Sequence, residues 1–162
     1  MKRKRKPRNI PWCGPAVVSL ITGESAAVCI DVIRSVRGYF GGGSAYHAPV
    51  RGMSPMELTS VFERMGYLTE LHGFGGTLEK FIDTLAKENH SRYLVAVENP
   101  PHYIIVRKCD EECYVFDNYH PFGVPIKKSS LREKPLVMVF EVKLQNPSKL
   151  EKDHPARSMV GE

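Results

Sequence analysis

The hydrophobic pattern of this chain changes from a helical period to a strand-like period close to residue 88. Before that point apolar residues recur at spacings of three and four, as in helices that bury one face. After it, short runs rich in β-branched and aromatic residues are separated by turn-forming residues. Because helices come first and strands follow them, the sequence predicts an α+β fold with a small antiparallel sheet, and not alternating βαβ units.

Capping residues and glycines bound four predicted helices. Their expected ranges are 13–22, 25–36, 54–65 and 77–85. The third is the best marked, because Ser54-Pro55-Met56-Glu57 is a capping box with proline at the first helical position. The Gly-rich segment 39–52 is predicted to be a loop.

Four strands are predicted in the second half, at 93–97, 102–107, 114–116 and 136–142. The segment from Cys109 to Cys113 is expected to form the tip of a hairpin between the second and third of them. A chain of 162 residues suits one domain with a hydrophobic core. We therefore expect a basic arm at 1–9, a folded domain at 10–145 and a loosely held polar tail at 146–162.

Positive charge is concentrated at the start of the chain. The net charge is +5, and six basic residues lie between Lys2 and Arg8, so the rest of the chain is close to neutral. Such a run is typical of a solvated tail, with nucleic-acid binding through Lys2–Arg8 as the alternative. Prolines and glycines interrupt any signal-peptide core, and no run approaches the about 18 apolar residues of a membrane helix. We expect a cytoplasmic protein with no membrane partner.

The four cysteines are too few for a disulfide scaffold of this length. Cys29 lies on the buried stripe of the second helix and is expected to be inert. Cys109 and Cys113 resemble half of a zinc site, but no pair of histidines has a matching spacing; the candidates are His72, His90 and His120. We expect these two cysteines to be thiols or an occasional cross-strand disulfide, and we expect neither a metal nor a cofactor.

Cys13 has the position of a reactive thiol. Trp12 and Gly14-Pro15 set a tight entry into the first helix, and a helix N-terminus lowers the pKa of a thiol. The exposed N–H groups of such a turn also suit a developing oxyanion. A nucleophilic thiol further needs a base close by and a group that orients the base.

His102 is the candidate base, because it begins a strand whose hairpin partner ends near residue 117. A two-residue turn at Asp110-Glu111 pairs position 102 with 119 and places Asp117 on the same face. A three-residue loop would instead favour Asn118. We prefer Asp117 as the third member and keep Asn118 as the alternative.

The order of these motifs resembles papain-like cysteine peptidases, and most closely their bacteriocin-processing (double-glycine leader) peptidase-like branch. The resemblance rests on Trp12-Cys13-Gly14-Pro15-Ala16, on the run His102-Tyr103-Ile104-Ile105-Val106 and on Phe116-Asp117-Asn118, and it covers roughly residues 10–126. It implies a papain-like fold and cleavage of a peptide or isopeptide bond through a thioester, with Cys13, His102 and Asp117 as the catalytic residues.

The family has a glutamine for the oxyanion where this chain has Pro7, which carries no donor. Asn9 is the nearest amide that can replace it. Trp12, Tyr46 and Tyr103 are the candidate substrate-binding residues, for a peptide or protein substrate. The alternatives are an inactive peptide-binding module on the same fold, acyl transfer to an amine instead of water, and a nucleic-acid-associated protein.

Overall fold

The computed structural model describes residues 13–38, 50, 52–73, 75–86, 89–98 and 101–145. Within these ranges it contains four α-helices and a six-stranded antiparallel sheet, which confirms the predicted α+β class. The predicted arm 1–9, the tail 146–162 and most of the Gly-rich segment lie outside the described residues. Among the residues described, no single helix has the length and apolar composition to cross a membrane.

The helices begin where the capping residues predicted. They are α1 (Cys13–Thr22), α2 (Ala26–Val36), α3 (Pro55–Arg64) and α4 (Leu78–Asp83). The side chains of Ser25, Ser54 and Thr77 each accept the backbone N–H three residues ahead, as N-caps do. Only half of the predicted capping box forms, because the carboxylate of Glu57 instead pairs with Arg37 at 2.7 Å.

The strands form one sheet in the order β1-β6-β2-β3-β4-β5. Their bounds are β1 (Tyr67–Leu71), β2 (Arg92–Val97), β3 (His102–Cys109), β4 (Glu112–Phe116), β5 (Val124–Pro125) and β6 (Leu136–Leu144). The sequence did not predict β1 or β5. Because β1 follows α3 and pairs with β6, the predicted division into a helical half and a strand half is wrong in detail.

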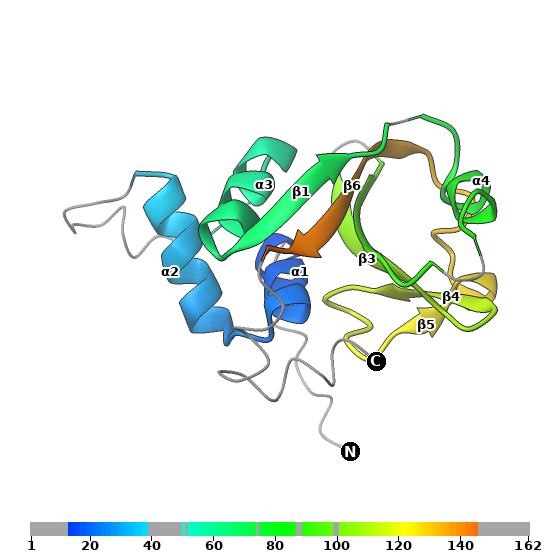
Figure 1. The fold of residues 1–162 in the computed structure, drawn as a ribbon, viewed down its shortest axis with the longest axis horizontal. Coiled ribbons are helices and arrows are strands. Elements are labelled where there is room, and N and C mark those ends of the chain that lie inside the picture. The colour runs from blue at the N-terminus through cyan, green and yellow to red at the C-terminus, as the bar shows by residue number, and fades with distance from the viewer. Residues whose placement is uncertain are drawn as a thin grey trace, which may run out of the picture.

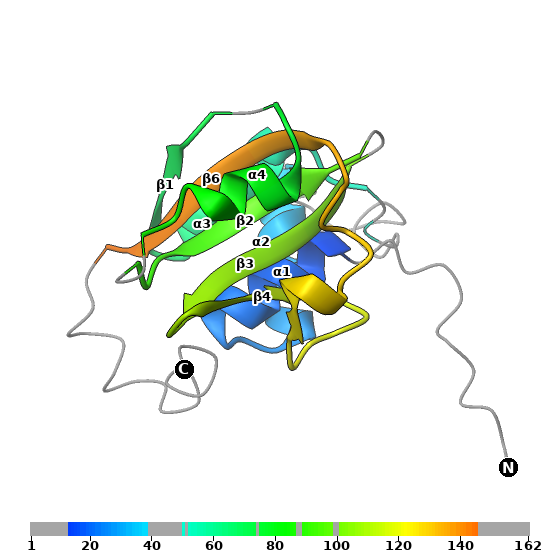
Figure 2. The same ribbon diagram turned by 90° about the vertical axis from the view of Figure 1, so that its right-hand side faces the viewer.

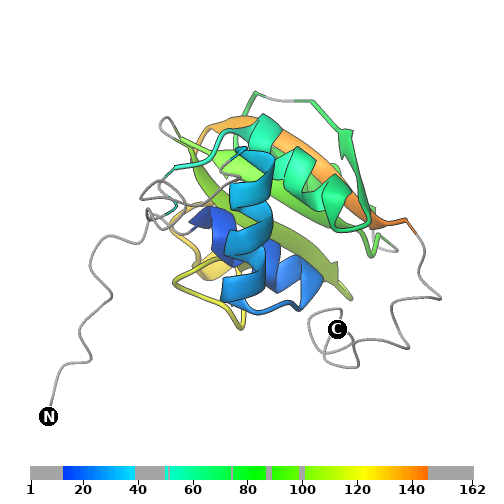
Figure 3. The ribbon, with the colours of Figure 1, turned by 90° about the vertical axis from the view of Figure 1, so that its left-hand side faces the viewer.

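The two faces of the sheet are covered by different helices. Helices α1, α2 and α3 lie against one face (Figures 1 and 3), and α4 lies against the other (Figure 2). Side chains of β3 alternate between the two cores: Tyr103 and Ile105 pack with α1–α3, whereas Ile104 and Val106 pack with Leu78 of α4. The first residues of β3 are therefore close to α1.

The β3–β4 hairpin has the predicted two-residue turn, with Cys109 paired to Glu112. In this register Cys113 lies opposite Lys108, so the side chains of Cys109 and Cys113 extend to opposite faces of the sheet. None of the four cysteines, all within the described ranges, forms a disulfide. The expected occasional disulfide between Cys109 and Cys113 does not fit this register, and the two thiols cannot share one zinc ion.

Candidate active site

Cys13 is the first residue of α1, so its sulfur lies at the end of the helix whose dipole favours a thiolate. Gly14, the next residue, is buried. A Cβ atom added to Gly14 would lie 2.6 Å from the sulfur of Met53. The missing side chain therefore allows the first turn of α1 to lie directly on Met53.

Tyr103 fixes the same region from the sheet. Its ring is 2% exposed within the core between the helices and the sheet, and its hydroxyl donates to the carbonyl of Met53. A buried ring cannot touch a substrate, so the predicted substrate-binding role of the Tyr103 side chain is wrong. The backbone N–H of Tyr103 instead hydrogen-bonds the sulfur of Cys13.

His102 begins β3, and its ring lies between a carboxylate and the thiol. Its Nε2 is 3.0 Å from Oδ2 of Asp117, and 23% of its side chain is exposed. The ring also shares a hydrogen bond with Cys13. Since Nε2 faces Asp117, Nδ1 is the nitrogen left for the sulfur. The fold thus places His102 between Asp117 and Cys13, as the sequence predicted.

Asp117 follows β4 and is 2% exposed. Its Oδ1 accepts the backbone N–H groups of Tyr119 and His120, at 2.9 and 2.7 Å. These bonds belong to a tight turn, which two backbone hydrogen bonds between Asp117 and His120 also close. The turn holds the carboxylate so that Oδ2 is directed at His102.

Asn118 does not take the third position. The register of the hairpin, continued past its last pair, places position 102 opposite 119 and Asp117 on the side of His102. The Oδ1 atom of Asn118 is buried and has no hydrogen-bond partner among the described residues. The structure therefore favours the two-residue-turn alternative and gives the contact with His102 to Asp117.

The pKa directions of the three groups favour an ion pair between sulfur and imidazole. Burial acts to raise the pKa of Cys13, but hydrogen bonds from His102 and from the N–H groups of Tyr103 and Gly14 outweigh it and hold the pKa below its usual value. The hydrogen bond to Asp117, with a smaller one to Cys13, raises the pKa of His102 to about 9. A thiolate beside an imidazolium is the reactive form of a cysteine nucleophile.

Asp117 remains ionised in this arrangement. Burial acts to raise its pKa, but the hydrogen bonds from His102 and from the N–H groups of His120 and Tyr119 hold the pKa below its usual value.

The pKa values of two other thiols shift in the opposite direction from that of Cys13. Burial raises the pKa of Cys29 to about 11 and also raises the pKa of Cys113.

Two neighbours of the group were not predicted as site residues. The ring of Tyr119 lies 6.1 Å from the ring of His102 and is tilted by 39°, with 63% of the residue exposed. The Nδ1 atom of His120 lies 3.3 Å from Oδ1 of Asp117. Their closeness to Asp117 along the chain was the available signal, since an aspartate commonly bonds the backbone two or three residues ahead and so gathers these side chains around it.

Several predicted residues lie outside the described ranges. These are Asn9, predicted for the oxyanion, Trp12 and Tyr46, predicted for the substrate, and the basic run Lys2–Arg8. Their roles stay predictions. The described part of the site consists of the thiol, the imidazole, the carboxylate and the backbone that positions them.

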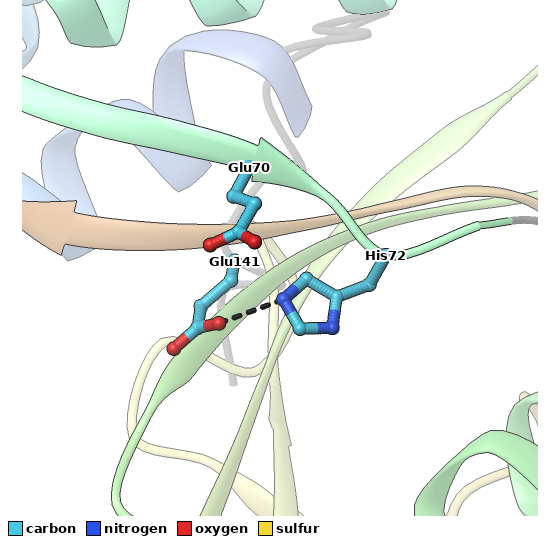
Figure 4. Close-up of side chains that lie close together, drawn as sticks. All are labelled: Glu70, His72 and Glu141. Carbon is cyan, nitrogen blue, oxygen red and sulfur yellow. Dashed lines mark ion pairs between the residues drawn. The ribbon is translucent and has the colours of Figure 1, made fainter.

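One group of side chains has the composition of a metal site. Ligand atoms of Glu70, His72 and Glu141 all lie within 4.8 Å of one another (Figure 4). The sequence-based expectation of no metal considered Cys109 and Cys113 with His72, His90 or His120 as the further ligands, and found no matching spacing among them. It did not consider this group, because Glu141 comes from the far end of the chain.

Comparisons with known proteins leave the identification to the geometry. No protein-family model, no curated protein and no solved structure matches this chain. The resemblance to papain-like peptidases therefore rests on the sequence motifs.

Proposed function

We propose that this chain is a cysteine hydrolase of the papain-like class, which cleaves a peptide or isopeptide bond. The observation that carries the proposal is a pair of hydrogen bonds made by the His102 ring, which donates from Nε2 to Oδ2 of Asp117 at 3.0 Å and also bonds the sulfur of Cys13. A nucleophile, its base and an orienting carboxylate are the parts that acyl transfer needs. Two features support the papain-like assignment. Cys13 lies at the N-terminus of α1, and this helix packs against β3, which begins with His102.

In the proposed reaction the Cys13 thiolate attacks the carbonyl carbon, and the electron pair of the C=O bond moves to oxygen. N–H groups in the first turn of α1 stabilise that oxyanion. When the C–N bond breaks, the imidazolium of His102 gives its proton to the leaving amine, and a thioester remains. Neutral His102 then takes a proton from water, whose oxygen attacks the thioester and releases the acid and the thiolate.

Asp117 orients the base in this scheme. Its carboxylate holds the N–H on Nε2 of His102, which leaves Nδ1 to exchange a proton with the sulfur. The backbone N–H groups that donate to Oδ1 stabilise the ionised form of this carboxylate. The carboxylate therefore stabilises the imidazolium without taking its proton.

The proposal is tested by incubating the full chain with a complex peptide mixture and identifying new termini by mass spectrometry. Cys13→Ala should abolish cleavage, and His102→Ala should lower it by about 10²–10⁴-fold, the usual contribution of general acid–base catalysis. Cys109→Ser is the matched control and should cleave like the wild type, because this thiol lies at the distant end of β3.

Iodoacetamide labelling provides a second measurement that needs no substrate. Cys13 should be alkylated much faster than Cys29, and the difference should depend on His102. If no peptide is cleaved and Cys13 reacts no faster than Cys109, the hydrolase proposal is wrong. Peptide binding without cleavage would then identify the alternative, a non-catalytic peptide-binding module.

A further inference from the structure

Three side chains of the types that can ligate a metal ion share one face of the sheet at its β1 edge. Glu70 and His72 are two residues apart, and Glu141 of β6 lies directly opposite Glu70. The N–H of His72 donates to the carbonyl of Val139 and so continues the pairing past the end of β1. Figure 4 shows the three side chains converging on one point, with Nε2 of His72 2.7 Å from Oε2 of Glu141.

This arrangement concentrates negative charge where a cation is needed. Like charges directly opposite one another destabilise an antiparallel pair, and Glu70 and Glu141 are such a pair. Glu141 is also only 7% exposed, and a buried carboxylate requires positive partners or donors. Besides His72, it receives the hydroxyl of Ser91.

An ammonium group already occupies the space between the two carboxylates. The Nζ atom of Lys143 lies 3.4 Å from Glu141 and 3.5 Å from Glu70. The Lys143 side chain is 53% exposed, and its long stem can turn toward solvent. The two carboxylates are therefore neutralised in part by the ammonium group of Lys143, whose side chain can turn away into solvent.

We propose that Glu70, His72 and Glu141 bind Zn²⁺, with the metal taking the place of the Lys143 ammonium. One imidazole nitrogen and two carboxylate oxygens are ligands that Zn²⁺ accepts, and three protein ligands leave a fourth position for water. Metal–ligand bonds of about 2.0–2.1 Å at tetrahedral angles require the His72–Glu141 contact to open to about 3.3 Å. His72 and Glu70 can make this movement, since their side chains are 35% and 66% exposed.

The zinc site is separate from the candidate active site. Glu141 lies opposite Tyr93, which belongs to the core under α4, on the other face from α1. The Tyr93 ring also meets the His72 ring edge-on at 5.6 Å and helps to orient it. We assign the metal a structural role, because it links β1 to β6 and neutralises their facing carboxylates.

The test is isothermal titration of the full chain with zinc chloride, in a Cys13→Ala background so that the reactive thiol does not compete. His72→Gln should weaken the binding at least tenfold, since it removes the only nitrogen ligand of the proposed set. Lys143→Gln should strengthen it about tenfold, because it removes the two ion pairs that compete with the metal. Glu63→Gln, an exposed carboxylate on α3, is the control and should leave the affinity unchanged.

The test is specific because His72→Gln should lower the zinc affinity and Lys143→Gln should raise it. Saturating zinc should also raise the unfolding temperature of the background protein and of Lys143→Gln, but not that of His72→Gln. Thermal unfolding without metal checks that each variant folds. If His72→Gln and Lys143→Gln bind zinc with the affinity of the background protein, any bound metal lies elsewhere and the proposal is wrong.

Discussion

Asp117→Asn tests how far the reactivity of Cys13 depends on a carboxylate that it does not touch. Asparagine has nearly the same shape, and its amide oxygen can still accept the N–H groups of Tyr119 and His120. The turn that carries residue 117 should therefore persist. What changes is the group that faces Nε2 of His102, from a charged acceptor to a neutral amide.

The size of the effect follows from the pKa of His102. The hydrogen bond to Asp117 is the largest cause of its rise from 6.5 to about 9. Loss of a neighbouring opposite charge commonly moves a pKa by about one to three units. If the pKa of His102 falls by one to two units, the ratio of the thiolate–imidazolium pair to the neutral thiol–imidazole pair falls about 10- to 100-fold. The alkylation rate of Cys13 at neutral pH should fall by up to that factor.

The measurement is the rate of iodoacetamide alkylation of Cys13 as a function of pH, followed by peptide mapping. In the wild type, fast labelling in the neutral range reflects the thiolate–imidazolium pair, which persists until His102 loses its proton near pH 9. In Asp117→Asn this pair should be lost at lower pH. Asn118→Ala is the matched control, because no hydrogen bond joins that side chain to His102 in the described structure.

One result would refute this reasoning. If Asp117→Asn labels at the wild-type rate across the whole pH range while remaining folded by circular dichroism, the carboxylate does not stabilise the imidazolium. The low pKa of Cys13 would then arise from α1 and the backbone N–H groups alone.

Three further predictions concern the site and its support. Turnover should be bell-shaped in pH: it falls on the alkaline side near pH 9 as His102 deprotonates, and on the acid side below the lowered pKa of Cys13, where the thiolate is protonated. Gly123→Ala should cost at least about 2 kcal/mol in urea unfolding, because Gly123 has a φ of 88° and an added Cβ would lie 2.7 Å from the Phe116 ring; an unchanged midpoint would contradict this. Ser54→Ala should cost about 1 kcal/mol by the same assay, with its neighbour Met56→Ala, 69% exposed, as a near-neutral control.

Much of the candidate site was predictable because its parts depend on local signals. The start of α1 at Cys13, the turn at Asp110-Glu111 and the start of β3 at His102 are each set by a few neighbouring residues. Once the hairpin register is fixed, the position of Asp117 beside His102 follows from strand geometry. The role of the Tyr103 side chain was mispredicted, because its burial depends on α1 and on Met53.

Strand β1 was not predicted, because its formation depends on a distant part of the chain. Leu68 and Leu71 of this segment are about half exposed, and the strand has no continuous buried face to give an alternating pattern. It is a strand because β6, more than sixty residues later, offers its edge to pair with. The same pairing places Glu70 opposite Glu141.

The sequence alone determined the class of fold, the helix caps, the presence of the β3–β4 hairpin and the candidate residues Cys13, His102 and Asp117, since each depends on residues a few positions apart; the length of the hairpin turn was left open and the structure decided it. Only the tertiary structure decided that thiol, imidazole and carboxylate share hydrogen bonds, and that Glu70, His72 and Glu141 meet. Those contacts join segments distant in the chain, and they depend on how the sheet edges and helices pack, which no local pattern records.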